Sequence, residues 1–129
     1  MHYLLNQPIL FRFFFVSALI TVTWTCLMPL DEPVVNINNF DKVMHLGAYF
    51  VLAGLFERSF PNHFIKVGII ALIAYSGLIE LLQGQTGYRS ASLADLIANS
   101  LGVFCYLALM PIVRKLAKPP ATKAASCTG

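Results

Sequence analysis

The chain has 129 residues, of which 57% are hydrophobic and only 12% are charged, and its formal net charge is +3. A soluble domain carries about 25% charged residues, and so short a chain has little core volume in which to hide this much apolar surface. The composition therefore argues against a soluble globular protein and favours one integral membrane domain. The basic residues are not gathered into one stripe, so no nucleic-acid partner is expected.

The first apolar segment is predicted to form a helix over residues 11–30. It has 18 uncharged residues between Arg12 and Asp31, which corresponds to about 27 Å of helix and fits the hydrocarbon layer of a bilayer. No small-x-small cleavage site follows, so a retained span is predicted rather than a cleaved signal peptide. The second helix is predicted over residues 41–60, where an uncharged core of only 14 residues is flanked by charged side chains able to snorkel.

The third helix is predicted over residues 64–83 and the fourth over residues 92–113. Turn signals separate the later helices, at Pro61-Asn62 and at Gly84 to Gly87. Residues 1–117 are thus expected to form one all-α domain, a four-helix transmembrane bundle. Residues 118–129 are expected to form a disordered cytoplasmic tail.

The distribution of Lys and Arg predicts the orientation of this bundle. With four spans both termini lie on one side of the membrane, together with seven of the nine basic residues. The other side holds only Lys42 and Arg89. The positive-inside rule therefore predicts that both termini are cytoplasmic.

Polar side chains occur in three short clusters in or beside the last three apolar segments. In the predicted topology each cluster lies at the outer end of a helix. Polar residues are costly in a bilayer and commonly mark functional sites, so the sequence predicts an outward-facing polar pocket. The seven residues are Asp41, His45, Glu80, Gln83, Arg89, Asp95 and Asn99.

Asp41 and His45 are four residues apart and share a helix face. Asp41 could equally serve as a helix cap or first-turn acid. His45 could be a hydrogen-bonded packing residue, or a proton carrier oriented by Asp41.

Glu80 and Gln83 also share a helix face, because they are three residues apart. Glu80 follows 13 uncharged residues, so its carboxylate is expected to need a partner unless it snorkels from the helix end. Arg89 is the first candidate for an ion pair, and Lys42 is the second.

Ser92 and Asp95 form an S-x-x-D capping box ahead of the fourth apolar run. Asn99 lies one turn deeper on the face of Asp95, where interhelical hydrogen bonding is its simplest role. Small residues are expected to allow close helix approach, namely Ala98, Ser100 and Gly102 on the fourth helix and Gly47 and Gly54 on the second.

Taken in order, the motifs are D-K-x-x-H at Asp41 to His45, E-x-x-Q at Glu80 to Gln83, and R-x-x-S-x-x-D-x-x-x-N at Arg89 to Asn99. This series, over about residues 40–110, resembles the VanZ-like family of small bacterial integral membrane proteins. The resemblance implies a multi-pass protein of the bacterial cytoplasmic membrane. The family's namesake is associated with low-level resistance to the glycopeptide teicoplanin, whereas no particular reaction is implied.

Three functions remain open from the sequence. The preferred one is a non-enzymatic envelope protein that binds a membrane lipid, a lipid-linked cell-wall precursor or a glycopeptide or lipopeptide antibiotic. Its expected ligand-binding residues are Asp41, Lys42, His45, Glu80, Gln83, Arg89, Asp95 and Asn99.

The second function is a membrane-embedded enzyme in which His45, Glu80 and Asp95 supply acid–base catalysis or, more weakly, metal ligands. The third is a structural or partner-binding subunit. The preferred prediction includes no metal and no cofactor, and the oligomeric state is left open.

Overall fold

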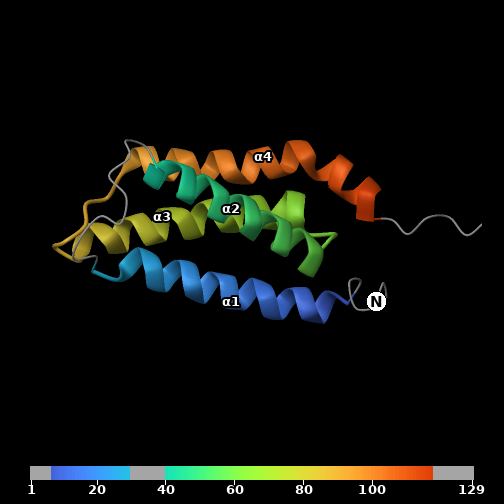
Figure 1. Ribbon diagram of the computed structural model, residues 1–129, viewed down its shortest axis with the longest axis horizontal. Helices are drawn as coiled ribbons and strands as arrows, with labels where there is room; N and C mark the ends of the chain where they lie inside the picture. Colours follow the sequence, from blue (N-terminus) through green and yellow to red (C-terminus); the bar gives the residue numbers. More distant parts are fainter. Residues whose placement is uncertain (1–6, 30–39, 118–129) are drawn as a thin grey trace, which may run out of the picture.

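The computed structural model describes residues 7–29 and 40–117. Within these ranges every regular element is helical, as predicted: α1 (Pro8–Leu27), α2 (Phe40–Ser59), the short π-helix η2 (Phe64–Gly68), α3 (Ile69–Gln85) and α4 (Leu93–Ala117). Each long helix runs antiparallel to the next along the chain (Figure 1). The predicted tail, residues 118–129, lies outside the described residues.

With η2 counted as the start of the third helix, the helices begin and end within four residues of the predicted positions, and proline accounts for both shifts in α1. Pro8 occupies the first helical turn, where its missing N–H removes no hydrogen bond. At the other end Met28 is extended, with ψ 136°, as a residue before proline favours. The helix therefore ends at Leu27, ahead of Pro29. Pro111 lies inside α4, which continues past it to Ala117.

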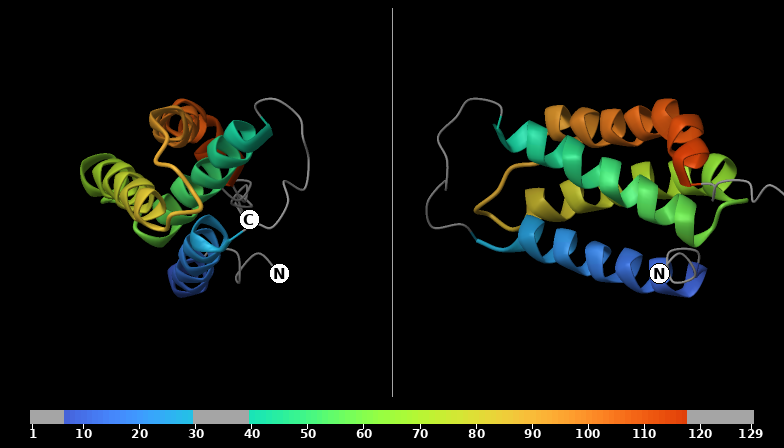
Figure 2. Two further views of the ribbon diagram at one scale, coloured as in Figure 1. Left: turned by 90° about the vertical axis from the view of Figure 1, so that its left-hand side faces the viewer. Right: turned by 45° about the vertical axis from the view of Figure 1, so that its right-hand side comes forward.

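Helix α2 lies between α1 and α4 in the two views of Figure 2. It packs most extensively against α4 and next against α1. Their shared core combines aromatic and aliphatic side chains: Tyr49, Leu52, Ala53, Phe64, Leu72, Val103, Tyr106 and Met110. Helix α2 is also the most polar of the long helices; its charged residues lie at its two ends, and one of them, Glu57, is buried.

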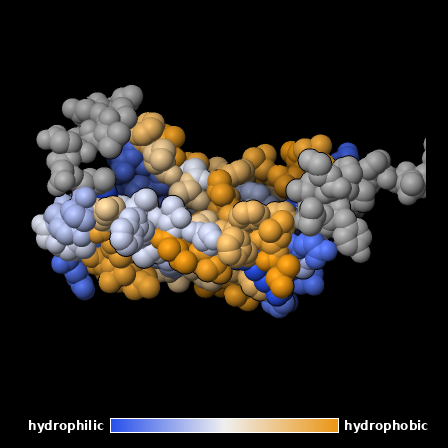
Figure 3. All heavy atoms as spheres, turned by 60° about the horizontal axis from the view of Figure 1, so that its bottom comes forward, coloured by the Kyte–Doolittle hydropathy of each residue, from blue (hydrophilic) through white to orange (hydrophobic). Residues whose placement is uncertain are grey.

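The outer surface of the bundle is strongly apolar. Figure 3 shows hydrophobic residues over the middle of one face and hydrophilic residues gathered mainly toward its two ends. Within residues 7–29 and 40–117, three helical segments are long and apolar enough to cross a membrane, namely Pro8–Leu27, Phe64–Gln85 and Leu93–Ala117. Side chains such as Phe13, Ile20, Trp24 and Ile70 are exposed on them, as expected for contact with lipid.

Helices α2 and α4 approach each other closely at Gly102. A Cβ atom at this position would lie 2.3 Å from Leu46 O, so a larger residue would meet backbone. Gly54 faces the side chain of Tyr106, and a Cβ atom at Gly54 would lie 3.1 Å from the Tyr106 ring. The expectation for Gly47 is wrong, because a Cβ atom there would meet nothing within 4 Å.

The bundle has two ends, which we name here. At the polar end α1 and α3 finish and α2 and α4 begin. At the terminal end α1 begins and α4 finishes, as Figure 1 shows.

Sequence reasoning missed a second polar cluster, at the terminal end. Glu57 is buried there, and it accepts hydrogen bonds from Arg114 Nε at 2.7 Å and from Tyr106 Oη at 3.3 Å.

Replacing Arg114 with alanine is expected to lower the free energy of unfolding by about 1–2 kcal/mol, because the buried Glu57 carboxylate would keep only the Tyr106 hydroxyl. The loss is moderate because the Arg114 side chain is 44% exposed and water can partly replace it. Thermal unfolding of the purified protein in detergent measures the effect. Lys115→Ala is the matched control, since Lys115 is an exposed neighbour with no such partner among the described residues. Equal losses for both variants would contradict this role for Arg114.

Candidate functional site at the polar end

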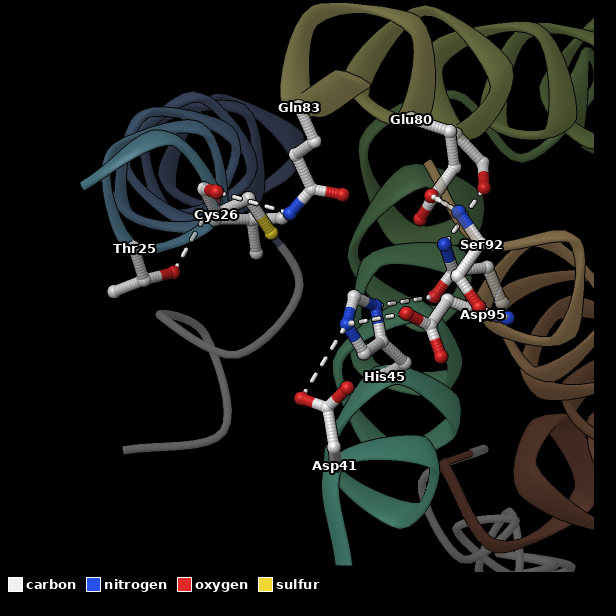
Figure 4. Close-up of polar contacts among 11 residues, drawn as sticks. Thr25, Cys26, Asp41, His45, Glu80, Gln83, Ser92 and Asp95 are labelled. Atoms are coloured by element: carbon white, nitrogen blue, oxygen red, sulfur yellow. Dashed lines mark hydrogen bonds and ion pairs between the residues drawn. The ribbon is translucent and has the colours of Figure 1, made fainter. Parts of the chain in front are cut away.

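The polar end brings residues of α2, α3 and α4 together, as Figure 4 shows. Asp41 and His45 lie on the first turns of α2. Glu80 and Gln83 lie on the last turns of α3. The start of α4 adds Asp95 and Asn99, the latter fully buried. Six of the seven polar residues predicted from the sequence thus lie on three helix ends that meet.

A buried hydrogen-bond chain links three helices at this end. His45 Nδ1 lies 3.0 Å from Asn99 Oδ1, and Asn99 Nδ2 donates to Ser76 Oγ at 2.7 Å. All three side chains are at least nine-tenths buried. Ser76 was not predicted, because a single serine in an apolar helix gives no sequence signal. These two hydrogen bonds confirm the interhelical role expected for Asn99.

The other ring nitrogen of His45 faces two carboxylates. Its Nε2 lies 3.7 Å from Asp41 Oδ1 and 4.0 Å from Asp95 Oδ2. Both separations exceed a hydrogen bond. Asp41 is 71% exposed whereas Asp95 is only 14% exposed. The imidazole is therefore buried on one side and opens toward solvent between two acids, an arrangement that can exchange a proton or hold a cation.

Glu80 reaches across from α3 and caps the start of α4. Its Oε2 accepts a hydrogen bond of 2.9 Å from the backbone N–H of Ser92, while Ser92 Oγ accepts one of 3.3 Å from the backbone N–H of Asp95. In an ordinary capping box the Asp95 carboxylate would bind the Ser92 N–H. Because Glu80 takes that N–H, the Asp95 side chain is free to face His45.

The expected ion pair of Glu80 is not formed. Among the described residues no ion pair within 4.0 Å joins Glu80 to Arg89 or to Lys42. Instead, the backbone N–H of Ser92 serves one oxygen of the carboxylate. The second oxygen, Oε1, is buried and has no hydrogen-bond partner in the part of the chain that the structure describes.

Gln83 and Tyr88 fasten the end of α1 to this site. Gln83 Nε2 donates to Cys26 O at 2.9 Å, and the Tyr88 hydroxyl donates to Leu27 O. The last carbonyls of a helix lack partners within it, and Pro29 prevents α1 from continuing. The two side chains therefore satisfy groups that α1 leaves open, a role that the sequence did not predict for Gln83.

Arg89 and Lys42 are the basic residues of the polar end. Arg89 is partly exposed and Lys42 is exposed, and neither forms an ion pair within the described ranges. An apolar pocket of ≈ 530 Å³ lies along the last turns of α1. Its lining residues are Leu19, Ile20, Thr23, Trp24, Leu27, Met28 and Pro29.

Comparison with known proteins agrees with the resemblance of the motifs. A family model described as VanZ/LLP1 matches residues 6–114, which is most of the chain. The chain belongs to the VanZ/LLP1 family. All the polar residues of the site lie within the matched part of this VanZ-like membrane protein. No curated protein and no solved structure matches the chain.

Proposed function

We propose that this VanZ-like protein spans the bacterial cytoplasmic membrane four times, with both termini in the cytoplasm and the polar end outside. The antiparallel order of the helices supports four spans, and α2 with its 20 residues is about 30 Å long. The terminal end carries Arg12, Arg58, Lys66, Arg114 and Lys115, whereas Lys42 and Arg89 lie at the polar end. The positive-inside rule then orients the bundle.

We further propose that the polar end binds the anionic headgroup of a lipid or of a lipid-linked cell-wall precursor. The observation that carries this proposal is that the segment holding Arg89 is bonded to the end of α1 that lines the apolar pocket. The neighbour of Arg89, Tyr88, is bonded to Leu27 O, and Leu27 lines the pocket. An acyl or polyprenyl chain would lie along α1, while the Arg89 guanidinium would bind a phosphate or carboxylate. Lys42 would add a second positive charge.

The bonds already made within the site assign different roles to the remaining residues. Both polar atoms of Asn99 and the amide nitrogen of Gln83 are bonded within the protein. In this proposal they hold the helix ends in place, and contact with the ligand falls to exposed groups. A lipopeptide or glycopeptide antibiotic with an acyl chain would offer the same pair of features, so teicoplanin belongs in the test.

A photoactivatable phospholipid in nanodiscs tests headgroup binding. Arg89→Ala is expected to lower labelling at low probe concentration by about tenfold, the loss of one hydrogen bond to a charged group. Arg58→Ala is the matched control, an arginine at the terminal end of the bundle. Competition with a lipid-linked cell-wall precursor and with teicoplanin separates the ligand sources. Equal labelling of the wild type and Arg89→Ala would contradict the proposal.

A structural or partner-binding role is the second candidate, because so many polar groups of the site bond to each other across helices. His45, Asn99 and Ser76 join three helices. In that case Arg89→Ala would leave both lipid labelling and envelope-drug susceptibility unchanged in a complemented deletion strain, whereas Asn99→Ala would lower protein abundance.

A further inference from the structure

The Nε2 atom of His45 is the feature of the polar end that its internal bonds leave unexplained. The side chain is 9% exposed, and Nε2 has no hydrogen bond among the described residues. It points between the carboxylates of Asp41 and Asp95, at 3.7 and 4.0 Å (Figure 4). The ligand atoms of the three residues all lie within 4.8 Å of one another.

The hydrogen-bond chain behind the ring indicates which nitrogen carries the proton. Asn99 Nδ2 donates to Ser76 Oγ, and the Asn99 carbonyl oxygen faces His45 Nδ1. An oxygen acceptor requires Nδ1 to carry a hydrogen. In the neutral ring Nε2 then presents a lone pair. A lone pair directed between two carboxylates repels both of them unless a positive charge lies between the three groups.

The cap of α4 provides independent support. The carboxylate of Asp95 would normally bind the Ser92 N–H in a capping box. Glu80 Oε2 occupies that N–H instead, and the Asp95 carboxylate faces His45 while remaining 14% exposed. Glu80, from another helix, thus performs the capping that Asp95 could perform. The Asp95 carboxylate, which is poorly solvated, is left beside the histidine.

We propose that Asp41, His45 and Asp95 bind a divalent first-row transition-metal cation such as Zn²⁺ or Mn²⁺. One imidazole and two carboxylates form a mixed nitrogen and oxygen donor set that suits these ions. The hydrogen bond from Nδ1 to Asn99 is the outer contact that metal-bound histidines usually make. This site goes beyond headgroup binding and does not depend on it, and it departs from the expectation of no metal drawn from the sequence.

The spacing of the donor atoms fits a shared ion. Zinc ligands lie about 2.0–2.2 Å from the metal, so two of them are at most roughly 4.4 Å apart. The two distances from Nε2 are within this limit. The Asp41 side chain, 71% exposed, can rotate to close any wider gap. Its exposure also leaves the solvent side of the ion open to water or to an anionic oxygen.

Metal binding is tested on the full-length protein, purified in detergent and freed of metal with a chelator. Titration with Zn²⁺ alone is expected to reach one equivalent by calorimetry. Asp41→Asn and His45→Gln should each weaken affinity by more than the roughly 10–100-fold typical of a lost outer-shell partner. Asp41→Asn is the safer variant for folding, because the side chain is mostly exposed. His63→Gln, at an exposed histidine of the terminal end, should bind like the wild type.

A second measurement identifies the ligand directly. With Mn²⁺ bound, pulsed electron paramagnetic resonance should detect coupling to one imidazole nitrogen in the wild type and in His63→Gln, and none in His45→Gln. Absence of stoichiometric binding of either ion, or affinities unchanged by Asp41→Asn and His45→Gln, would overturn the proposal. So would nitrogen NMR that finds both ring nitrogens of His45 protonated with no affinity for metal, because the positive charge would then be the imidazolium itself.

Discussion

Gly102→Ala is expected to lower the free energy of unfolding by about 3 kcal/mol, at the upper end of the usual range for overpacking. The added methyl would lie 2.3 Å from Leu46 O and 3.0 Å from Phe50 N. These are backbone atoms of α2, so no side-chain rotation can relieve the contact. Helices α2 and α4, which form the largest helix–helix interface of the bundle, would have to separate. This separation would also move His45 away from Asn99.

Gly47→Ala is the matched control for this prediction. Gly47 also lies within α2, but a Cβ atom there would meet nothing within 4 Å. The substitution should be neutral or stabilise the protein by up to about 1 kcal/mol, because alanine favours the helix over glycine. Thermal unfolding in detergent compares the two variants with the wild type. Equal melting temperatures for Gly102→Ala and the wild type would mean that the two helices do not pack this closely.

The contrast between these glycines shows where prediction from the sequence stops. Length, hydropathy and turn residues were enough to predict four helices and to place their ends within a few residues. The rotation of each helix about its axis could not be predicted, because α2 is apolar on several sides and its pattern does not reveal which side meets α4. Small residues therefore marked candidate contacts, and only packing distinguished Gly102 from Gly47.

The site was predictable to a similar depth. Motif positions at successive helix ends were enough to bring Asp41, His45, Asp95 and Asn99 to one end of the bundle. The hydrogen bonds and ion pairs of the site could not be predicted, since a carboxylate beside a helix start can accept hydrogen bonds from backbone N–H groups as well as from arginine. Glu80 accepts a hydrogen bond from the Ser92 N–H and forms no ion pair with Arg89 among the described residues. The Glu57 cluster was missed for a related reason, because charges at a helix end look solvent-exposed until a neighbouring helix covers them.

Glu80→Ala is expected to lower the free energy of unfolding by about 2–3 kcal/mol. The variant loses a hydrogen bond to a charged group and leaves space where a residue only 5% exposed was packed. Part of the loss should be recovered by Asp95. With the Ser92 N–H released, the Asp95 carboxylate can turn back and complete the capping box of α4.

A double-mutant cycle with Asp95→Ala detects this exchange. In the wild type Asp95 does not bind the Ser92 N–H, so Asp95→Ala should cost only about 0.3–1 kcal/mol, the usual value of an acid in the first helical turn. In the Glu80→Ala background it should cost about 1 kcal/mol more, since the remaining cap is then removed. Unfolding of the four proteins measures a coupling free energy well above the roughly 0.3–0.5 kcal/mol expected for independent sites.

The same exchange connects helix capping to the proposed cation site. If Asp95 turns toward Ser92 in Glu80→Ala, one carboxylate leaves His45, and Zn²⁺ affinity should fall although Glu80 is not a ligand. Glu80→Gln keeps an acceptor oxygen for the Ser92 N–H, so it should retain most of both stability and affinity. Additive stabilities in the cycle, together with equal Zn²⁺ affinity for Glu80→Ala and Glu80→Gln, would mean that Asp95 is held at His45 by other contacts and that Glu80 has no part in positioning it.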